Sequence, residues 1–173
     1  MTRNEQGDAA GNGKVYGVPY RWGCTVIVYR KDRLRRRDKE GEGIRDWDDL
    51  LRPSLRKRIA FMDYPREFVG IALKTLGMSY NSSKEDLEAC GIGYENVERR
   101  LRHLLSQAKV VSNKDHVRAY SAGDVDVIVG SSDDLIPLAQ KSSNSVIVIP
   151  ASGTALFADL WCIPKNAAGG YVF

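Results

Sequence analysis

The stretch IAFMDYPREFVGIALKTLGM, residues 59–78, decides how the rest of the chain is read. Its first four residues predict a short buried strand, the next three a tight turn, and the remainder a helix. The carboxylate of Asp63 is suited to cap that helix, because it can accept hydrogen bonds from free amides of the first turn. Glu67 follows within the turn, where the helix dipole favours negative charge. Open α/β sheets bind ligands at the carboxyl ends of their strands, so capping and ligand binding explain Glu67 equally well.

The composition is that of an ordinary globular domain. The chain has 173 residues, of which 43% are hydrophobic and 28% charged, and its net charge is +4. This balance allows a substantial core, and it does not by itself argue for nucleic acid as a partner. The three cysteines, Cys24, Cys90 and Cys162, are widely spaced in apolar contexts, which predicts small buried side chains. With only two histidines in the sequence, we expect no metal site and no cofactor.

Strand and helix patterns alternate along the chain. Two strand signals are predicted between residues 14 and 30, separated by an aromatic corner at residues 20–23. Residues 95–109 predict an amphipathic helix, and residues 125–130 a buried strand that opens into a polar turn and another helix. Further strands are expected at 146–150 and within 155–164. Such alternation predicts a layered α/β domain.

A basic run lies between the first strands and the deciding stretch. It contains Arg33, Arg35, Arg36 and Arg37 and is followed at once by acidic residues and glycines within residues 38–43. We interpret residues 31–45 as a solvated loop. A nucleic-acid-binding patch is the less favoured alternative, because no aromatic residues are interleaved with the arginines.

Four segments together are similar to the spermidine/putrescine-binding (polyamine-binding) components of ABC transporters. The resembling segments are VPYRWGCTVIVYRKD (18–32), DWDDLLRPSLRKRIAFMDYPREFVGIALKTLG (46–77), AGDVDVIVGSS (122–132) and ALFADLWCIPKNA (155–167). The resemblance implies a type 2 periplasmic-binding-protein-like lobe, a mixed sheet flanked by helices. Members of the family have two such lobes that close on the ligand, and this chain resembles only the second.

The resemblance also implies a domain layout and a role. We expect a disordered lead-in at 1–14, a single α/β lobe at 15–167 with crossover segments near 16–22 and 146–152, and a tail at 168–173. The implied role is polyamine capture for ABC permease subunits by a monomer that is not an enzyme, does not insert stably into a membrane and binds no nucleic acid. The implied location is the periplasm, with a plastid or another compartment left open.

The resemblance assigns ligand-binding roles at matching positions. Glu67 and Asp159 stand where the family holds terminal amines, and Phe157 stands where an aromatic ring lies along the methylene chain. Two positions depart from the family pattern. Ser131 replaces the tryptophan of spermidine-type members, and Tyr64 occupies a position where some members carry an acid. These departures leave the preferred polyamine open.

Residue chemistry agrees with a polyamine site, because such a ligand needs separated carboxylates with aromatic faces between them. Asp133 and the rings of Tyr64 and Trp22 are further candidates. Purely structural roles also remain open for three of these residues. Asp133 can be a charge at a helix N-terminus, Phe157 a core residue and Trp22 a residue that packs the hinge. Asp159 interrupts an apolar strand, where an unpaired buried charge would be costly. A different class is also open, a remnant or interaction domain with no ligand of its own.

Overall fold

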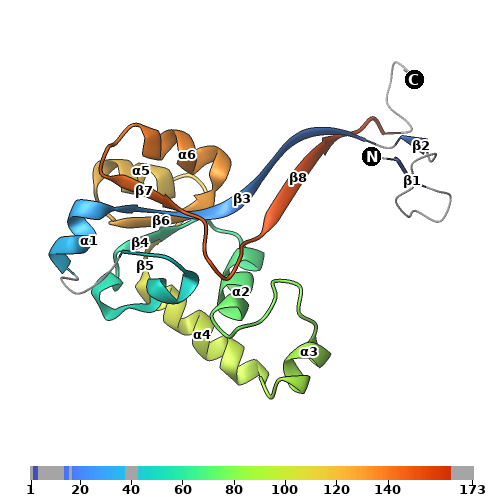
Figure 1. Cartoon of the computed structure of the whole chain (residues 1–173), viewed down its shortest axis with the longest axis horizontal. Coiled ribbons are helices and arrows are strands. Elements are labelled where there is room, and N and C mark those ends of the chain that lie inside the picture. Colours follow the sequence, from blue (N-terminus) through green and yellow to red (C-terminus); the bar gives the residue numbers. More distant parts are fainter. Residues whose placement is uncertain (1, 4–13, 16, 38–42, 165–173) are drawn as a thin grey trace. The chain divides into compact units, whose positions relative to one another are not determined.

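The computed structural model describes residues 2–3, 14–15, 17–37 and 43–164. The tail at 168–173 and most of the expected lead-in therefore lie outside the described residues, although β1 (Thr2–Arg3) pairs with β2 (Lys14–Val15) in an antiparallel manner. The chain divides into two compact units (Figure 1). The main unit is Cys24–Ala155, and the second, which we call the ribbon unit, combines Met1–Gly23 with Leu156–Phe173.

A mixed sheet forms the centre of the main unit. Its strand order is β5 (Ala108–Val111), β4 (Ile59–Phe61), β6 (Val127–Ser131), β3 (Val18–Arg30) and β7 (Ser145–Val148). Strand β4 is parallel to both of its neighbours, whereas β3 is antiparallel to β6 and β7. The mixed sheet expected from the sequence is confirmed.

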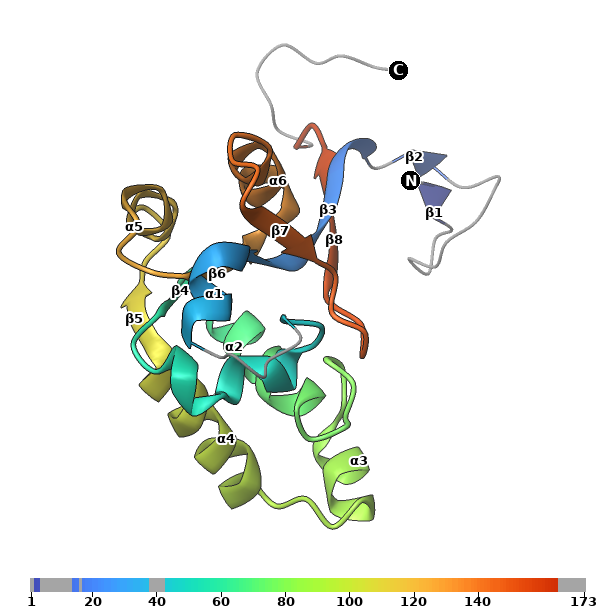
Figure 2. The ribbon, with the colours of Figure 1, turned by 60° about the vertical axis from the view of Figure 1, so that its left-hand side comes forward.

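Helices cover both faces of this sheet. The first core contains side chains of α2 (Pro65–Lys74) and α4 (Tyr94–Gln107), and the second contains side chains of α5 (His116–Ala122) and α6 (Ser132–Gln140). The short helix α3 (Lys84–Ala89) packs beside α2 and α4 through a smaller apolar cluster (Figure 2).

Strand periodicity explains why the sheet has two apolar faces. The residues of a strand alternate between its faces, so aligned rows across the sheet alternate as well. Phe61, Val129 and Ile27 are paired across β4, β6 and β3, and all three belong to the core under α2 and α4. The next row contains Ala60 and Ile128, which belong to the core under α5 and α6. Residues 127–129 of β6 are therefore all apolar, because successive side chains face a core on each side.

Two 3₁₀ turns, Trp47–Leu51 and Pro53–Leu55, extend the first core. Trp47 is fully buried, and its indole nitrogen donates to the Gly153 carbonyl at 2.9 Å. Asp46 caps the first turn, as its oxygen accepts from the Trp47 amide.

The three cysteines were predicted to be buried, and this prediction is wrong. Cys24 is half-buried, whereas Cys90 and Cys162 are exposed.

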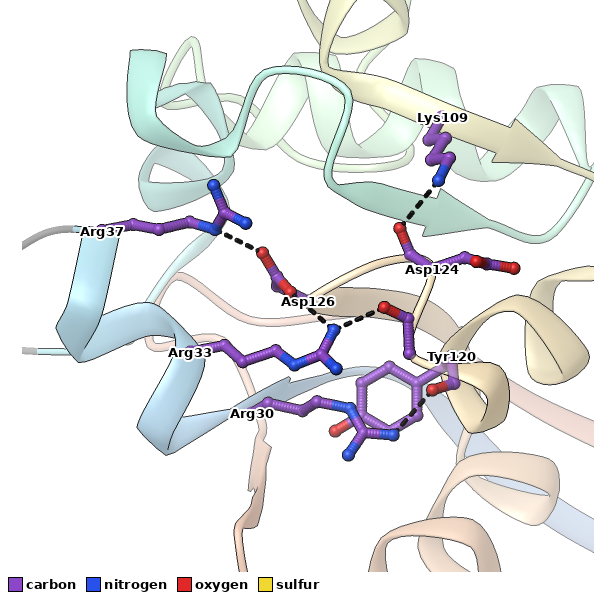
Figure 3. A network of polar contacts seen from close by, with 8 residues as sticks. Arg30, Arg33, Arg37, Lys109, Tyr120, Asp124 and Asp126 are labelled. Carbon is purple, nitrogen blue, oxygen red and sulfur yellow. Dashed lines mark hydrogen bonds and ion pairs between the residues drawn. The ribbon is translucent and has the colours of Figure 1, made fainter.

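The basic run is helical, so the predicted solvated loop is wrong at its start. Helix α1 (Lys31–Arg37) buries Leu34 and places Arg33 and Arg37 one turn apart. Both arginines bind the carboxylate of Asp126, at 3.3 and 2.7 Å, and this carboxylate is almost fully buried (Figure 3). Arg33 also donates to the Gly123 carbonyl. These two arginines neutralise a buried charge, which explains part of the basic run without nucleic acid.

The neighbouring cations in Figure 3 also make contacts within the fold. Arg30 donates to the Tyr120 carbonyl at 2.7 Å and lies 4.7 Å from the centre of the Tyr120 ring. Lys109 donates to the main-chain carbonyl of Asp124 at 3.0 Å. The network therefore joins α1, β3, β5 and the segment that precedes β6.

The ribbon unit contains the first half of β3 and the strand β8 (Leu156–Trp161), which pairs with β3. Strand β3 is continuous from Val18 to Arg30, so the corner predicted at residues 20–23 is wrong. Within the ribbon unit, Tyr20 contacts Trp161 edge-to-face at 5.0 Å between ring centres. The expected strand within 155–164 is confirmed.

Candidate functional site

Three strands bring polar residues to one edge of the main sheet. Because β4 and β6 are parallel neighbours, their carboxyl ends meet at this edge, and the antiparallel β3 enters the main unit there. Thr25 of β3 is paired with Ser131 of β6. Helix α2 begins at Pro65 after β4, and α6 begins at Ser132 after β6. The edge thus has the arrangement that α/β proteins use for ligands, with helix N-termini after parallel strands.

Glu67 is the acid held in place at this edge. It lies in the first turn of α2, half-buried, and its Oε2 accepts a hydrogen bond from Thr25 Oγ1 at 2.7 Å. Thr25 is itself buried, and its carbonyl accepts from Thr154 Oγ1 at 2.6 Å. Thr25 was missed at the sequence level. The available signal was a hydroxyl residue within an otherwise apolar strand. It is separated by an even number of positions from the strand residues that face α2, so its side chain lies on the same face of the sheet.

Tyr80 is a second residue that sequence reasoning missed. Its ring packs directly against Gly70 of α2, where no side chain intervenes. Burial raises the pKa of the Tyr80 phenol, and the nearby negative charge of Glu67 raises this pKa further, whereas the Thr154 hydroxyl opposes the shift. Tyr80 is therefore neutral in the physiological pH range and forms an uncharged neighbour of the Glu67 carboxylate.

The predicted cap of α2 is wrong. Tyr64, not Asp63, is the N-cap residue, and no side chain accepts a hydrogen bond from the first turn. Instead, the Asp63 amide donates to Asn113 Oδ1 at 2.8 Å, and Asn113 Nδ2 donates to the Asp63 carbonyl at 3.1 Å. The turn after β4 is thus fixed to the residues that follow β5. Pro65 at the first helical position reduces the need for a cap, because it has no amide hydrogen to satisfy. Tyr64 is exposed.

Ser131 and Asp133 take part in the start of α6. Ser131 is the N-cap, and its Oγ accepts from the Asp133 amide at 3.3 Å. Ser132 Oγ accepts from the Cys24 amide at 3.1 Å, which ties α6 to β3, and donates weakly to Asp133 Oδ1 at 3.5 Å. Asp133 is half-buried in the first turn. The structure gives both residues a role in starting the helix, beside any contact with a ligand.

The remaining three predicted site residues belong to the ribbon unit. Trp22 is highly exposed, Phe157 is half-buried, and Asp159 forms an ion pair with Arg21 at 2.5 Å. The argument that Asp159 lies in a buried strand was wrong, because β8 is largely exposed and the carboxylate is paired. The other four predicted residues, Glu67, Tyr64, Ser131 and Asp133, all belong to the main unit and its polar edge.

His116 is a buried titratable group that sequence reasoning also missed. It begins α5, directly after the turn that follows β5, and packs against β6 near Gly130. Neither ring nitrogen completes a hydrogen bond of ordinary geometry with the described residues. Burial lowers the pKa of His116, although the charge of Asp134 and the Ser112 backbone favour the protonated form. His103, the other histidine, is exposed.

The fold, the edge site and the sequence identify the class of protein. The chain belongs to the family of bacterial extracellular solute-binding proteins, whose family model matches residues 4–169. Within the described ranges, no helix has the length and apolar character needed to cross a membrane.

Individual relatives share a class of ligand in their names. The chain is 27% identical over 153 residues to a spermidine/putrescine-binding periplasmic protein of Salmonella typhimurium, with 88% of this chain and 40% of the relative covered. It is 34% identical over 165 residues to a putrescine/cadaverine-binding protein of Pseudomonas aeruginosa, with 90% and 44% covered. The chain therefore spans about two fifths of the length of the curated relatives it matches.

Solved structures of proteins with similar names also resemble this chain. A putative spermidine/putrescine ABC transporter protein from Listeria monocytogenes superposes with a TM-score of 0.71 at 27% identity, covering 88% of this chain and 44% of that one. The substrate-binding protein PotD from Streptococcus pneumoniae superposes with a TM-score of 0.71 at 26% identity, covering 87% and 43%. The type of lobe expected from the sequence is thus confirmed.

Proposed function

We propose that this chain is a polyamine-binding lobe of a solute receptor that serves an ABC permease. The observation that carries the proposal is the fixed carboxylate of Glu67 at the carboxyl edge of β4 and β6, held by Thr25 at 2.7 Å. The names of the relatives, which specify spermidine, putrescine or cadaverine, support the same class of ligand. Like those relatives named as periplasmic, the receptor is proposed to act in the periplasm, as a carrier and not as an enzyme.

The chemistry of the edge suits an ammonium group. A carboxylate that accepts one hydrogen bond from a hydroxyl keeps lone pairs for a second, charged donor, and such charge-assisted bonds are stronger than neutral ones. The exposed ring of Tyr64 offers a face to methylene groups or to the cation. In this proposal Ser131 and Asp133 contribute polar contacts from the start of α6, while their cap geometry is kept.

Within the ribbon unit, Asp159 is proposed as an acidic ligand contact, with Phe157 and Trp22 as aromatic contacts. Asp159 already has a cationic partner in Arg21. A polyamine ammonium must therefore share or displace the Arg21 guanidinium. This competition makes Asp159 a weaker contributor than Glu67, whose described partner is a neutral hydroxyl.

Titration calorimetry with putrescine, cadaverine and spermidine tests the assignment of Glu67. We expect Glu67→Gln to weaken polyamine binding about tenfold or more, because one charge-assisted hydrogen bond contributes about 1.5–3 kcal/mol. The matched control is Glu95→Gln, which removes the same charge from the first turn of α4. Equal affinities for Glu67→Gln and the unmodified chain would show that the site is assigned wrongly.

Thr25 is proposed as a positioning residue for Glu67. Thr25→Val keeps the shape of the side chain and removes the donor, so the carboxylate of Glu67 is no longer fixed in orientation. We expect a several-fold loss of polyamine affinity, largely restored by Thr25→Ser, which keeps the hydroxyl. A loss of affinity in Thr25→Ser as large as in Thr25→Val would indicate packing, not positioning.

A further inference from the structure

Thr25 occupies one of the two oxygens of the Glu67 carboxylate. Its Oγ1 donates to Glu67 Oε2 at 2.7 Å. A carboxylate has two oxygens with about four lone-pair sites, so Oε2 shares its capacity with this hydroxyl while Oε1 keeps its own. The other neighbour, Tyr80, is a neutral phenol and adds no positive charge. The carboxylate therefore offers a cationic ligand one unshared oxygen.

The Thr25 hydroxyl is held in this position by contacts on both sides of its backbone. Thr25 is buried in β3, and its amide donates to the Ala155 carbonyl at 3.2 Å. Its carbonyl accepts from Thr154 Oγ1 at 2.6 Å. The side chain is also β-branched, which restricts its χ1 rotation. A ligand that needs Oε2 must therefore compete with a donor that has little freedom to turn away.

The two common cationic end groups of natural amines use a carboxylate in different ways. A primary ammonium is a compact charge with N–H groups that rotate, so it can bind a single oxygen. A guanidinium is a rigid planar fork, and its strongest contact with a carboxylate is bidentate, with one N–H group on each oxygen. At Glu67 such a fork must share Oε2 with Thr25. An ammonium needs only Oε1.

We propose that Thr25 determines which cationic end group the site accepts, so that Glu67 binds primary ammonium groups in preference to guanidinium groups. This inference rests on the proposed polyamine site and adds a choice among ligands of the same charge. Thr25 acts here through Glu67, as a specificity-determining residue. Diamines with two ammonium ends are the favoured ligands, and ligands with a guanidinium at both ends are disfavoured.

Titration calorimetry of the 173-residue chain with two probes tests this choice. The probes are putrescine and 1,4-diguanidinobutane, which carries a guanidinium at each end of the same butane chain, so neither end can avoid the comparison. At neutral pH and fixed ionic strength we expect putrescine to bind about fivefold more tightly, which corresponds to one ordinary hydrogen bond.

The decisive quantity is the change in this affinity ratio when Thr25 is altered, because the two probes also differ in length. Thr25→Val frees Oε2, so the ratio should fall about fivefold, whereas Thr25→Ser keeps the hydroxyl and should keep the ratio. The matched control is Thr75→Val. It removes another buried hydroxyl, which donates to the Ala72 carbonyl at the C-terminal end of α2, and it should leave the ratio unchanged.

The possible failures are distinct. If Thr25→Val weakens the binding of both probes by the same factor, the selection of end groups is overturned, although Thr25 still positions Glu67. An equal fall of the ratio in Thr75→Val overturns the assignment to Thr25. A chain that binds neither probe overturns the polyamine site itself and this inference with it.

Discussion

Replacing Gly70 by alanine should destabilise this protein, although the same change stabilises most helices. Gly70 lies inside α2, where an alanine is ordinarily about 1 kcal/mol more favourable. A Cβ at Gly70, however, would lie 1.9 Å from Cδ1 and 2.0 Å from Cε1 of the Tyr80 ring. The ring is packed against the first core, so it cannot move without losing contacts. Overpacking of this kind costs about 1–3 kcal/mol, so after the gain in helix propensity we expect a net loss of up to about 2 kcal/mol.

Urea denaturation followed by circular dichroism measures this loss as a lower midpoint. The matched control is the same substitution in a Tyr80→Ala background, where the ring is absent. There, Gly70→Ala should regain its ordinary effect and stabilise the chain by up to about 1 kcal/mol. The reversal of sign is the decisive result. If Gly70→Ala stabilises the protein with Tyr80 in place, the close packing inferred between α2 and this ring is refuted.

Two further predictions concern buried titratable groups. Asp126→Asn should lower stability by about 2–3 kcal/mol in urea denaturation, because it leaves two arginines without their carboxylate, whereas Asp124→Asn should have little effect because Lys109 binds its main-chain carbonyl. His116 has a lowered pKa in the folded chain, so protonation favours the unfolded state. Stability should be full above the unfolded pKa of about 6.5 and fall by up to about 1.4 kcal/mol per pH unit below it. His116→Gln should remove this dependence.

The sequence predicted the main sheet well because its strands face a core on both sides. The consecutive apolar residues 127–129 alternate between the two cores, which is the pattern of a strand buried on both faces. The failure at residues 31–45 has a different cause. The arginines of α1 were interpreted as solvated, but Arg33 and Arg37 are held by a buried aspartate about ninety positions away. Periodicity within one segment does not reveal a partner at that distance.

The sequence predicted the position of Glu67 at a helix start, but not the residues that contact it. Glu67 could be placed at a helix start from its neighbours alone, because the strand, the proline and the helix are adjacent in sequence. Thr25 and Tyr80 contact the same region from other elements, and no local pattern marks them. The cap at Asp63 failed for the same reason, since Asn113 binds its backbone from beyond the next strand.

The strand β8 shows why an apolar pattern alone does not decide what a segment contacts. Such a pattern indicates that side chains gain free energy by leaving water, about 25 cal/mol for each Å² removed, but it does not specify whose atoms replace the water. The segment 155–164 was interpreted as an apolar strand, with Phe157 as a possible core residue and Asp159 as a costly charge within it. The structure keeps Leu156 and Trp161 exposed and pairs Asp159 with Arg21. The favourable free energy of burial therefore remains available to these side chains, because the apolar pattern of the strand does not determine which surface covers it.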